Sequence, residues 1–250
     1  MGVSSARNMA IIKSKGELIS FLDSDDLWHP NKLAIQIEYL KNNPNVHLVY
    51  SDYIIKSEIV GSHKNSSEFT PKHFRKCNIH DLFFQNHIGI LTVLLKKKCL
   101  SNNDVFDTSL KGAEDYELWL RLALDYNLHY IPQSLATYCW HGENTSNDKF
   151  MMAKQEAKAI CLFIDKSPDV YKILGKNAIT TRLFNLYNEI GDFNIWPTRN
   201  AMEAQYFYFL AFKQRPLDMN IRIKLFKAFI PSHIFNYIAW RWKKLVDVFE

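Results

Sequence analysis

A short apolar segment that leads directly into a cluster of acidic residues constrains the fold of this chain more than any other feature. Residues 18–22 are Leu-Ile-Ser-Phe-Leu, and the next four are Asp-Ser-Asp-Asp. An apolar segment this short, bounded by Gly16 and Asp23, is typical of a buried strand. Acidic residues at the carboxyl end of such a strand lie where α/β sheets bind ligands. The sequence therefore predicts an α/β domain with a ligand site after this strand.

Alternating strand and helix patterns extend this prediction along the chain. Pro30 suits the first turn of a helix whose inner face carries Leu33, Ile37 and Leu40. Strands are also expected over residues 46–55, 92–95 and 128–140, helices over residues 4–13 and 114–126, and a polar loop over residues 57–76. A short helix is expected to start at Asn78 or Asp81 and to run through Gln85. From residue 149 onward the pattern is helical almost throughout. We expect a mixed sheet flanked by helices over residues 1–148 and an α-helical region over residues 149–250.

The acidic cluster has the spacing of a cation site. Asp23 and Asp25 are two residues apart, so both carboxylates lie on the same side of an extended backbone. Together they can bind one hard divalent cation, Mg²⁺ or Mn²⁺, and leave positions open for phosphate oxygens. Such a cation neutralises charge that develops on a leaving diphosphate. The alternative interpretation is a solvated turn that caps the next helix.

A second acidic pair, Glu114 and Asp115, follows Gly112 at the expected start of a helix. A helix N-terminus stabilises carboxylates and is expected to lower their pKa. An ionised carboxylate in this position can serve as a general base. From these residues alone, a pair that caps the helix is the better interpretation.

Three motifs in this order resemble those of the family 2 glycosyltransferases, which have the GT-A fold. The first comprises GVSSARN at residues 2–8 and GELISFLDSDDLW at residues 16–28, with Pro30 and Lys32 beyond it. The second comprises residues 106–107 and GAEDYELWLRL at residues 112–122, and a weaker third lies at residues 138–146. The resemblance implies a GT-A-like domain, a Rossmann-like mixed sheet flanked by helices, which transfers a sugar with inversion from a nucleotide-sugar.

The resemblance also implies roles for individual residues. Asp115 would be the catalytic base, and Glu114 would lie in the acceptor site. Asp23 and Asp25 would bind the cation and the donor diphosphate. The residues assigned to the donor nucleotide-sugar are Arg7, Asn8, Asp23, Asp25 and His141.

The beginning of the sequence differs from the family pattern. Family members normally have a strand, a helix and a strand before the Arg7-Asn8 segment, and these elements form the edge of the nucleotide pocket. Here the resemblance begins at residue 2 and extends to residue 146. We therefore expect an N-terminally truncated GT-A-like domain that lacks the family's acidic contacts to the base and ribose.

Charge is unevenly distributed along the chain. Residues 1–150 contain 16 Lys and Arg against 17 Asp and Glu, whereas residues 151–250 contain 15 against 9. Residues 219–246 have no acidic residue and interleave six Lys or Arg with six aromatic residues. This composition favours contact with an anionic membrane surface. The alternative is a helical tail that packs its aromatic side chains against the catalytic domain or a partner.

The resemblance implies an inverting, metal-dependent glycosyltransferase, for which we expect a role in surface polysaccharide or lipopolysaccharide synthesis. Its donor would be a UDP-sugar, its acceptor a glycan or a lipid-linked glycan, and no nucleic acid partner is expected. With no long apolar run, no signal peptide and no Cys-x-x-Cys motif, the chain is expected to be cytoplasmic and peripheral on the inner membrane face.

Two other functions remain open from the sequence. Residues 21–25 fit the strand and D-x-D motif of haloacid dehalogenase phosphotransferases, although Asp26 stands where that motif normally continues with a Gly-Thr-type turn. A non-catalytic glycosyltransferase remnant that serves as an interaction module is the second alternative.

Overall fold

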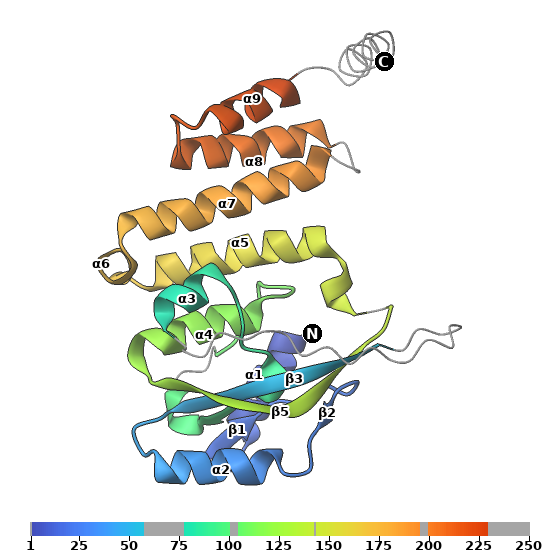
Figure 1. Cartoon of the computed structure of the whole chain (residues 1–250), viewed down its shortest axis with the longest axis vertical. Helices are drawn as coiled ribbons and strands as arrows, with labels where there is room; N and C mark the ends of the chain where they lie inside the picture. The colour runs from blue at the N-terminus through green and yellow to red at the C-terminus, as the bar shows by residue number, and fades with distance from the viewer. Residues whose placement is uncertain (1, 58–77, 101–104, 143, 196–199, 230–250) are drawn as a thin grey trace. The chain divides into compact units, whose positions relative to one another are not determined.

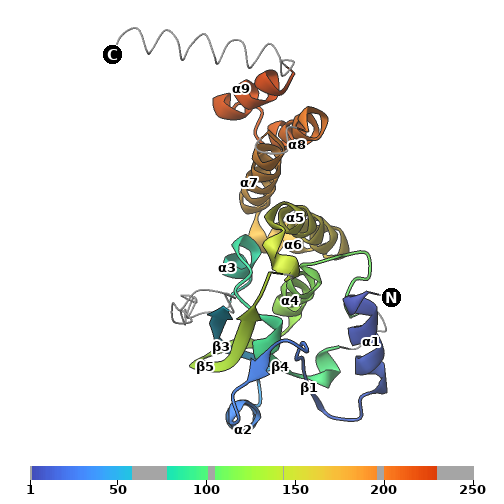
Figure 2. The ribbon, with the colours of Figure 1, turned by 90° about the vertical axis from the view of Figure 1, so that its right-hand side faces the viewer.

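The computed structural model of this chain describes residues 2–57, 78–100, 105–142, 144–195 and 200–229. The polar loop expected over residues 57–76 lies outside these ranges except for Ser57. Two compact units make up the chain, Met1–Leu174 and Gly175–Glu250. The first combines a sheet with helices, and the second is helical over its described residues (Figures 1 and 2).

The first unit is built on a mixed sheet with the strand order β1-β4-β3-β5-β2. Its strands are β1 (Leu18–Ser20), β2 (Leu27–Trp28), β3 (Leu48–Ser57), β4 (Leu94–Lys96) and β5 (Leu128–Trp140). The long strands β3 and β5 run parallel, whereas the other neighbouring strands pair antiparallel. The α/β class and the mixed sheet that the sequence predicts are confirmed.

Helices cover both faces of this sheet. They are α1 (Val3–Lys13), α2 (Lys32–Asn42), α3 (Ile79–Phe84), α4 (Glu114–Asp125), α5 (Lys149–Lys166) and α6 (Val170–Leu174), with short 3₁₀ turns at Ile90–Thr92, Lys97–Cys99 and Thr145–Asn147. Both views show α2 on one side of the sheet and α3 and α4 on the other. On the α2 side, Leu40 packs with Val49 and Leu94. Tyr50 follows Val49 on β3, so its side chain points to the opposite face of the sheet. Tyr50 is also fully buried, which shows that this second face is covered as well.

The buried stripe of α2 differs from the one predicted. Leu40 is buried and Ile37 is partly buried against the same cluster, but Leu33 remains 39% exposed. Lys32 and Gln36 are fully buried instead, and they share one helical face with Leu40. Polar side chains occupy this stripe because both find hydrogen-bond partners inside the protein.

Helices α5 and α6 belong to the first unit, although the sequence analysis placed all of residues 149–250 in a separate helical region. Helix α5 contacts the rest of the first unit through Lys166, whose ammonium donates to Asp107 at 2.8 Å and to Glu117 at 3.0 Å. Gln155 adds a hydrogen bond from the Lys111 N–H at 2.9 Å. The compact units divide after Leu174, and a domain boundary at residues 148/149 stays a prediction.

The second unit contains α7 (Lys176–Ile195), α8 (Ala201–Gln214) and α9 (Met219–Ala228). A buried apolar cluster joins α8 to α9; its members are Ala204, Tyr208, Ala211, Ile221 and Ala228. Among the helices in the described part of the chain, none is both long enough and apolar enough to cross a membrane.

Candidate active site

Arg7 on α1 brings together the two acidic motifs of the sequence. Its guanidinium donates from Nη2 to both carboxylate oxygens of Asp23, at 2.8 and 3.0 Å, and from Nη1 to Glu114 Oε1 at 2.7 Å. The Arg7 and Glu114 side chains are only 12% and 9% exposed, whereas that of Asp23 is 41% exposed. Hydrogen bonds between two charged groups are stronger than those between neutral groups. The loop after β1 and the start of α4 therefore meet at Arg7.

Asn8, the next residue on α1, holds the segment that precedes the second motif. Its amide donates to the Phe106 carbonyl and accepts from the Phe106 N–H, each at 2.8 Å. The ring of Phe106 lies 5.7 Å from the Arg7 guanidinium and contacts Phe21 edge-on. The Asn8 side chain thus makes two hydrogen bonds to the backbone of Phe106 and holds the residue whose ring packs against Arg7.

Asp25 contacts His141, which belongs to the third, weaker motif at residues 138–146. Its Oδ2 lies 3.1 Å from Nε2 of His141, and both side chains are about two-fifths exposed. Asn144 accepts a hydrogen bond from the His141 backbone N–H, which fixes the turn after β5. The structure brings the predicted residues Asp25 and His141 together from positions 116 residues apart.

Asp26 is a site residue that the sequence analysis did not assign. It is buried and accepts a hydrogen bond from the Cys139 N–H on β5 at 3.0 Å. Burial raises its pKa to about 6, the Cys139 N–H opposes that rise, and the negative charges of Asp25 and Asp23 add to it. Asp26 anchors the acidic loop to the sheet, and its only sequence signal is its place in the acidic run.

Asp115 is accessible in part and sits beside Glu114 at the first turn of α4. Its pKa is raised to about 7: burial is the largest cause and the Glu114 charge adds to the rise, whereas the Tyr116 N–H and Arg7 oppose it. The sequence analysis predicted a lowered pKa at this helix N-terminus, and that prediction is wrong. Desolvation and a neighbouring like charge outweigh the helix end here.

A strained turn directs this acidic pair. Gly112 has φ 137° and Ala113 has φ 58°, so two successive residues adopt left-handed backbone conformations just before α4. Such a conformation is rare for alanine, and strain of this kind gathers at functional sites. A Cβ on Gly112 would also lie 3.1 Å from the Met152 sulfur on α5. Glycine at position 112 thus lets α5 approach the turn.

Lys32 is the second residue whose importance the sequence analysis missed. It is fully buried, and its ammonium donates to Gln36 Oε1 at 2.8 Å, Ser20 Oγ at 3.0 Å and the Val93 carbonyl at 3.2 Å. The ammonium also lies 4.4 Å from the centre of the Trp28 ring. Ser20 ends β1 and Trp28 lies on β2, so Lys32 contacts both strands that flank the acidic loop.

The predicted cation ligands, Asp23 and Asp25, lie in different surroundings. Among the described residues no group of three or more His, Cys, Asp and Glu side chains converges on one point. Asp25 and His141 do converge, and of the two the carboxylate is the type of ligand that Mg²⁺ and Mn²⁺ prefer, with their remaining ligands from phosphate or water. Asp23 is held by Arg7 but keeps two-fifths of its side chain exposed. These residues fit a cation that is bound together with a diphosphate.

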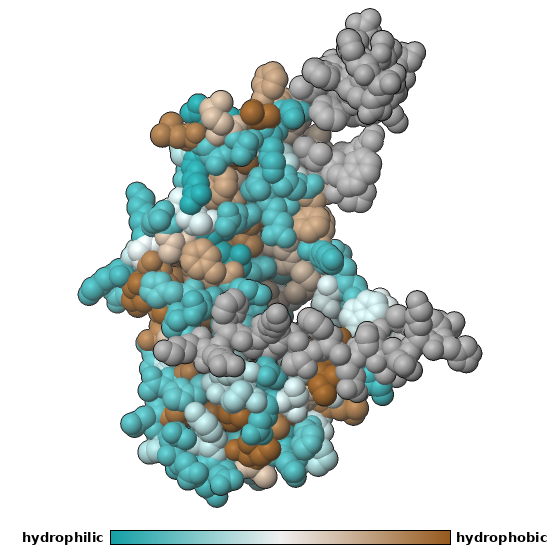
Figure 3. Space-filling model, viewed as in Figure 1, coloured by the Kyte–Doolittle hydropathy of each residue, from teal (hydrophilic) through white to brown (hydrophobic). Residues whose placement is uncertain are grey.

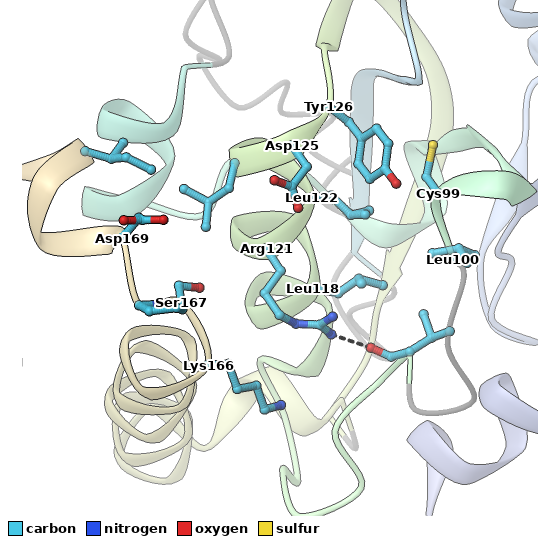
Figure 4. Close-up of a pocket in the computed structure, with 14 residues that line it drawn as sticks. Cys99, Leu100, Leu118, Arg121, Leu122, Asp125, Tyr126, Lys166, Ser167 and Asp169 are labelled. Carbon is cyan, nitrogen blue, oxygen red and sulfur yellow. Dashed lines mark hydrogen bonds between the residues drawn. The ribbon is translucent and has the colours of Figure 1, made fainter.

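A cavity of about 360 Å³ lies elsewhere on α4 (Figure 4). It borders the C-terminal half of the helix, including Arg121 and Asp125, and the turn at Lys166 to Asp169. Arg121 is bound to Glu117 and to the Val105 carbonyl. None of the predicted site residues lines this cavity, because Glu114 and Asp115 lie at the opposite end of α4.

Comparison with known proteins identifies the family. Residues 1–214 match the family described as glycosyltransferase like family 2. The chain belongs to this family. Its mixed sheet flanked by helices is the GT-A-like fold that the sequence motifs predict, and the match is to glycosyltransferases rather than to haloacid dehalogenase phosphotransferases.

Three curated relatives illustrate the family. WfgD of Escherichia coli, named as a UDP-Glc:alpha-D-GlcNAc-diphosphoundecaprenol beta-1,3-glucosyltransferase, is 31% identical over 66% of this chain and 62% of its own length. WcaA of Escherichia coli K12, a putative colanic acid biosynthesis glycosyl transferase, is 32% identical over 50% and 43%. An uncharacterized glycosyltransferase of Methanocaldococcus jannaschii is 29% identical over 55% and 47%. The chain thus spans about half the length of these relatives.

Proposed function

We propose that this chain acts as an inverting, metal-dependent glycosyltransferase of surface polysaccharide or lipopolysaccharide synthesis. Its donor is a UDP-sugar and its acceptor a glycan or a lipid-linked glycan. One observation carries the proposal: Arg7 joins Asp23 of the donor motif to Glu114 of the acceptor motif. The names of WfgD and WcaA, which concern glucosyl transfer to a diphosphoundecaprenol-linked sugar and colanic acid, support the choice of donor and pathway class.

On the donor side, Asp23 and Asp25 hold Mg²⁺ or Mn²⁺, with His141 beside Asp25. The bound cation supplies charge neutralisation at the leaving diphosphate. Arg7 keeps the Asp23 carboxylate oriented, and its positive charge lies next to the donor site. Asn8 contributes by holding the Phe106 backbone that supports Arg7.

On the acceptor side, Asp115 is the general base. A carboxylate with a pKa of about 7 is ionised in about half of the molecules at pH 7, and its ionised form is a stronger proton acceptor than an ordinary aspartate. It takes the proton from the acceptor hydroxyl while that oxygen attacks the anomeric carbon. Attack opposite the diphosphate inverts the anomeric centre. Glu114, locked by Arg7, keeps negative charge beside Asp115 and lines the acceptor site.

A lipid-linked acceptor requires the enzyme to work at a membrane. We place it in the cytoplasm, peripheral on the inner membrane face, with residues 219–246 in contact with anionic lipid. Residues 219–229 of this stretch lie on α9 and just beyond it, and residues 230–246 lie outside the described residues.

Calorimetric titration of a UDP-sugar into the full-length protein, with and without Mn²⁺, tests the donor site. We expect metal-dependent binding that Asp25→Asn abolishes, because one carboxylate charge is lost at the cation. Asp165→Asn, an exposed acid on α5, is the matched control and should bind as the wild type does. Unchanged metal-dependent affinity in Asp25→Asn would remove Asp25 from the site.

A further inference from the structure

Helix α8 carries large apolar side chains on more than one of its faces. Of its 14 residues, only Glu203 and Lys213 are charged. One face, which carries Ala204, Tyr208 and Ala211, is buried. The apolar faces of a helix are normally buried, yet another face of α8 is open. Its outward side chains are Met202, Tyr206 and Phe209, which are 80%, 58% and 45% exposed.

Helix α9 repeats this arrangement. Its buried face carries Ile221 and Ala228. Its outward face carries Met219, Ile223 and Phe226, which are 62%, 46% and 71% exposed and have the same i, i+4, i+7 spacing as the exposed residues of α8. Figure 3 shows apolar side chains interspersed with hydrophilic ones in the region of α9. We call these six side chains of α8 and α9 the outer apolar face.

The exposure is concentrated in this region. Eight of the 18 large apolar side chains that are exposed among the described residues lie between residues 202 and 229. Leu217 in the connection between the helices is 84% exposed, and Phe229 after α9 is 64% exposed. Exposure of large apolar side chains that is concentrated in one stretch of the chain in this way favours an interaction surface over scattered surface residues.

The charge of the second unit complements an anionic partner. Residues 1–174 contain 20 Lys and Arg and 20 Asp and Glu, whereas residues 175–250 contain 11 and 6. The whole net charge of +5 therefore belongs to the second unit. Lys213, Arg222 and Lys227 are exposed on the same helices as the outer apolar face, and the Lys213 ammonium lies 4.7 Å from the Phe209 ring centre. Asp218 is occupied as the N-cap of α9.

We propose that the outer apolar face is a docking surface for an anionic lipid bilayer, in which α8 takes part together with α9. Short helices with outward apolar side chains and basic residues beside them insert into the headgroup region without crossing the membrane. The cores of protein interfaces are depleted in charged residues, whereas here exposed lysine and arginine stand among the apolar side chains. This inference deepens, and rests on, the proposed membrane location.

Sedimentation of the full-length protein with vesicles tests this proposal without donor or cation. The wild type should bind phosphatidylglycerol vesicles in preference to phosphatidylcholine vesicles, and binding should weaken between about 0.05 and 0.5 M salt, since salt screens the charges. The double variant Ile223→Ser, Phe226→Ser should bind about tenfold more weakly at both salt concentrations, because removal of buried apolar area does not depend on screening. Tyr206→Ser should weaken binding in the same direction, which tests the part played by α8.

Exposed residues of α6 supply matched controls. Tyr171→Ser, at 52% exposure, and Lys172→Glu should bind as the wild type does, whereas Arg222→Glu with Lys227→Glu should weaken binding at low salt. Asp25→Asn should also bind normally, which separates this proposal from the catalytic one. A wild type that stays in the supernatant at low salt would overturn it. So would a dimer in solution that Phe226→Ser dissociates, because the face would then be an interface between two copies.

Discussion

At the scale of single residues, the site depends on contacts between distant positions. Asp23 and Glu114 could each be identified from local motifs, but their shared partner Arg7 lies 16 and 107 residues away from them. A single sequence contains no signal for such pairing. The sequence likewise contains no signal that sets Asp26 apart from its acidic neighbours. It differs from them in the structure because it accepts a hydrogen bond from the Cys139 N–H. Motifs therefore predicted the residue types of the site, and packing decided which of them meet.

Asp115→Asn tests the general base. The variant should retain donor binding but lower sugar transfer by about 10² or more, the usual scale for loss of a base. The pKa of Asp115 is raised to about 7, and only the ionised form accepts a proton. Transfer by the wild type should therefore rise with pH and reach half its plateau near pH 7. Initial rates of full-length protein across pH 5–9 would measure this, and a profile without an inflection near pH 7 would contradict it.

Lys32 makes a separate prediction about pH and stability. Burial lowers its pKa from 10.5 to about 7 in the folded chain. Between these values the unfolded chain binds more protons, so the free energy of unfolding should rise as pH increases above 7. Lys32→Met should remove this rise, while Lys41→Met, an exposed lysine at the other end of α2, should keep it. Urea unfolding at several pH values would measure both, and equal pH dependence in the two variants would disprove the assignment.

At the scale of elements, the sequence predicted what has strong periodicity. The strands near residues 46–55 and 128–140 and the helix near 114–126 are present as β3, β5 and α4. The two-residue strand β2 was missed, because its existence depends on pairing with β5 rather than on its own pattern. The inward face of α2 was predicted with Leu33, whereas Lys32 and Gln36 are buried. Tertiary hydrogen bonds overrode the apolar pattern there.

Packing between α7 and α8 can be tested at Gly191. A Cβ at this position would lie 2.4 Å from Tyr208 Cε1, far inside van der Waals contact. The Tyr208 ring cannot move aside easily, because its hydroxyl donates to Asp192 at 2.8 Å. Gly191→Ala should therefore destabilise the protein by about 1–3 kcal/mol, despite the higher helix propensity of alanine. Gly142→Ala is the control, because a Cβ added at Gly142 would have no neighbouring side chain or distant backbone atom within 4 Å. A Gly191→Ala protein that melts at the wild-type temperature would contradict the predicted steric clash with Tyr208.

At the scale of the whole molecule, charge and chemistry are divided between the two units. The first unit is electrically neutral in composition and contains every residue of the candidate active site, whereas the second contains the net positive charge and the outer apolar face. The sequence predicted this asymmetry from composition. The compact units divide after Leu174, where α5 and α6 have the same helical pattern as the helices after them and differ in what they contact.

This division predicts that membrane docking and chemistry can be separated by the form of the acceptor. Phe226→Ser together with Ile223→Ser should raise the KM for a lipid-linked acceptor in phosphatidylglycerol vesicles by about tenfold, since weaker docking lowers the local concentration of enzyme at the surface. The kcat for the same acceptor, and both constants for a soluble acceptor analogue, should remain unchanged, because the substituted side chains lie on α9 and are exposed. Asp115→Asn should instead lower kcat with either acceptor. Steady-state rates of the full-length protein on the two acceptors measure the difference. An equal loss on the soluble and the lipid-linked acceptor would show that the outer apolar face supports the fold or the chemistry, and the assignment of separate roles to the two units would fail.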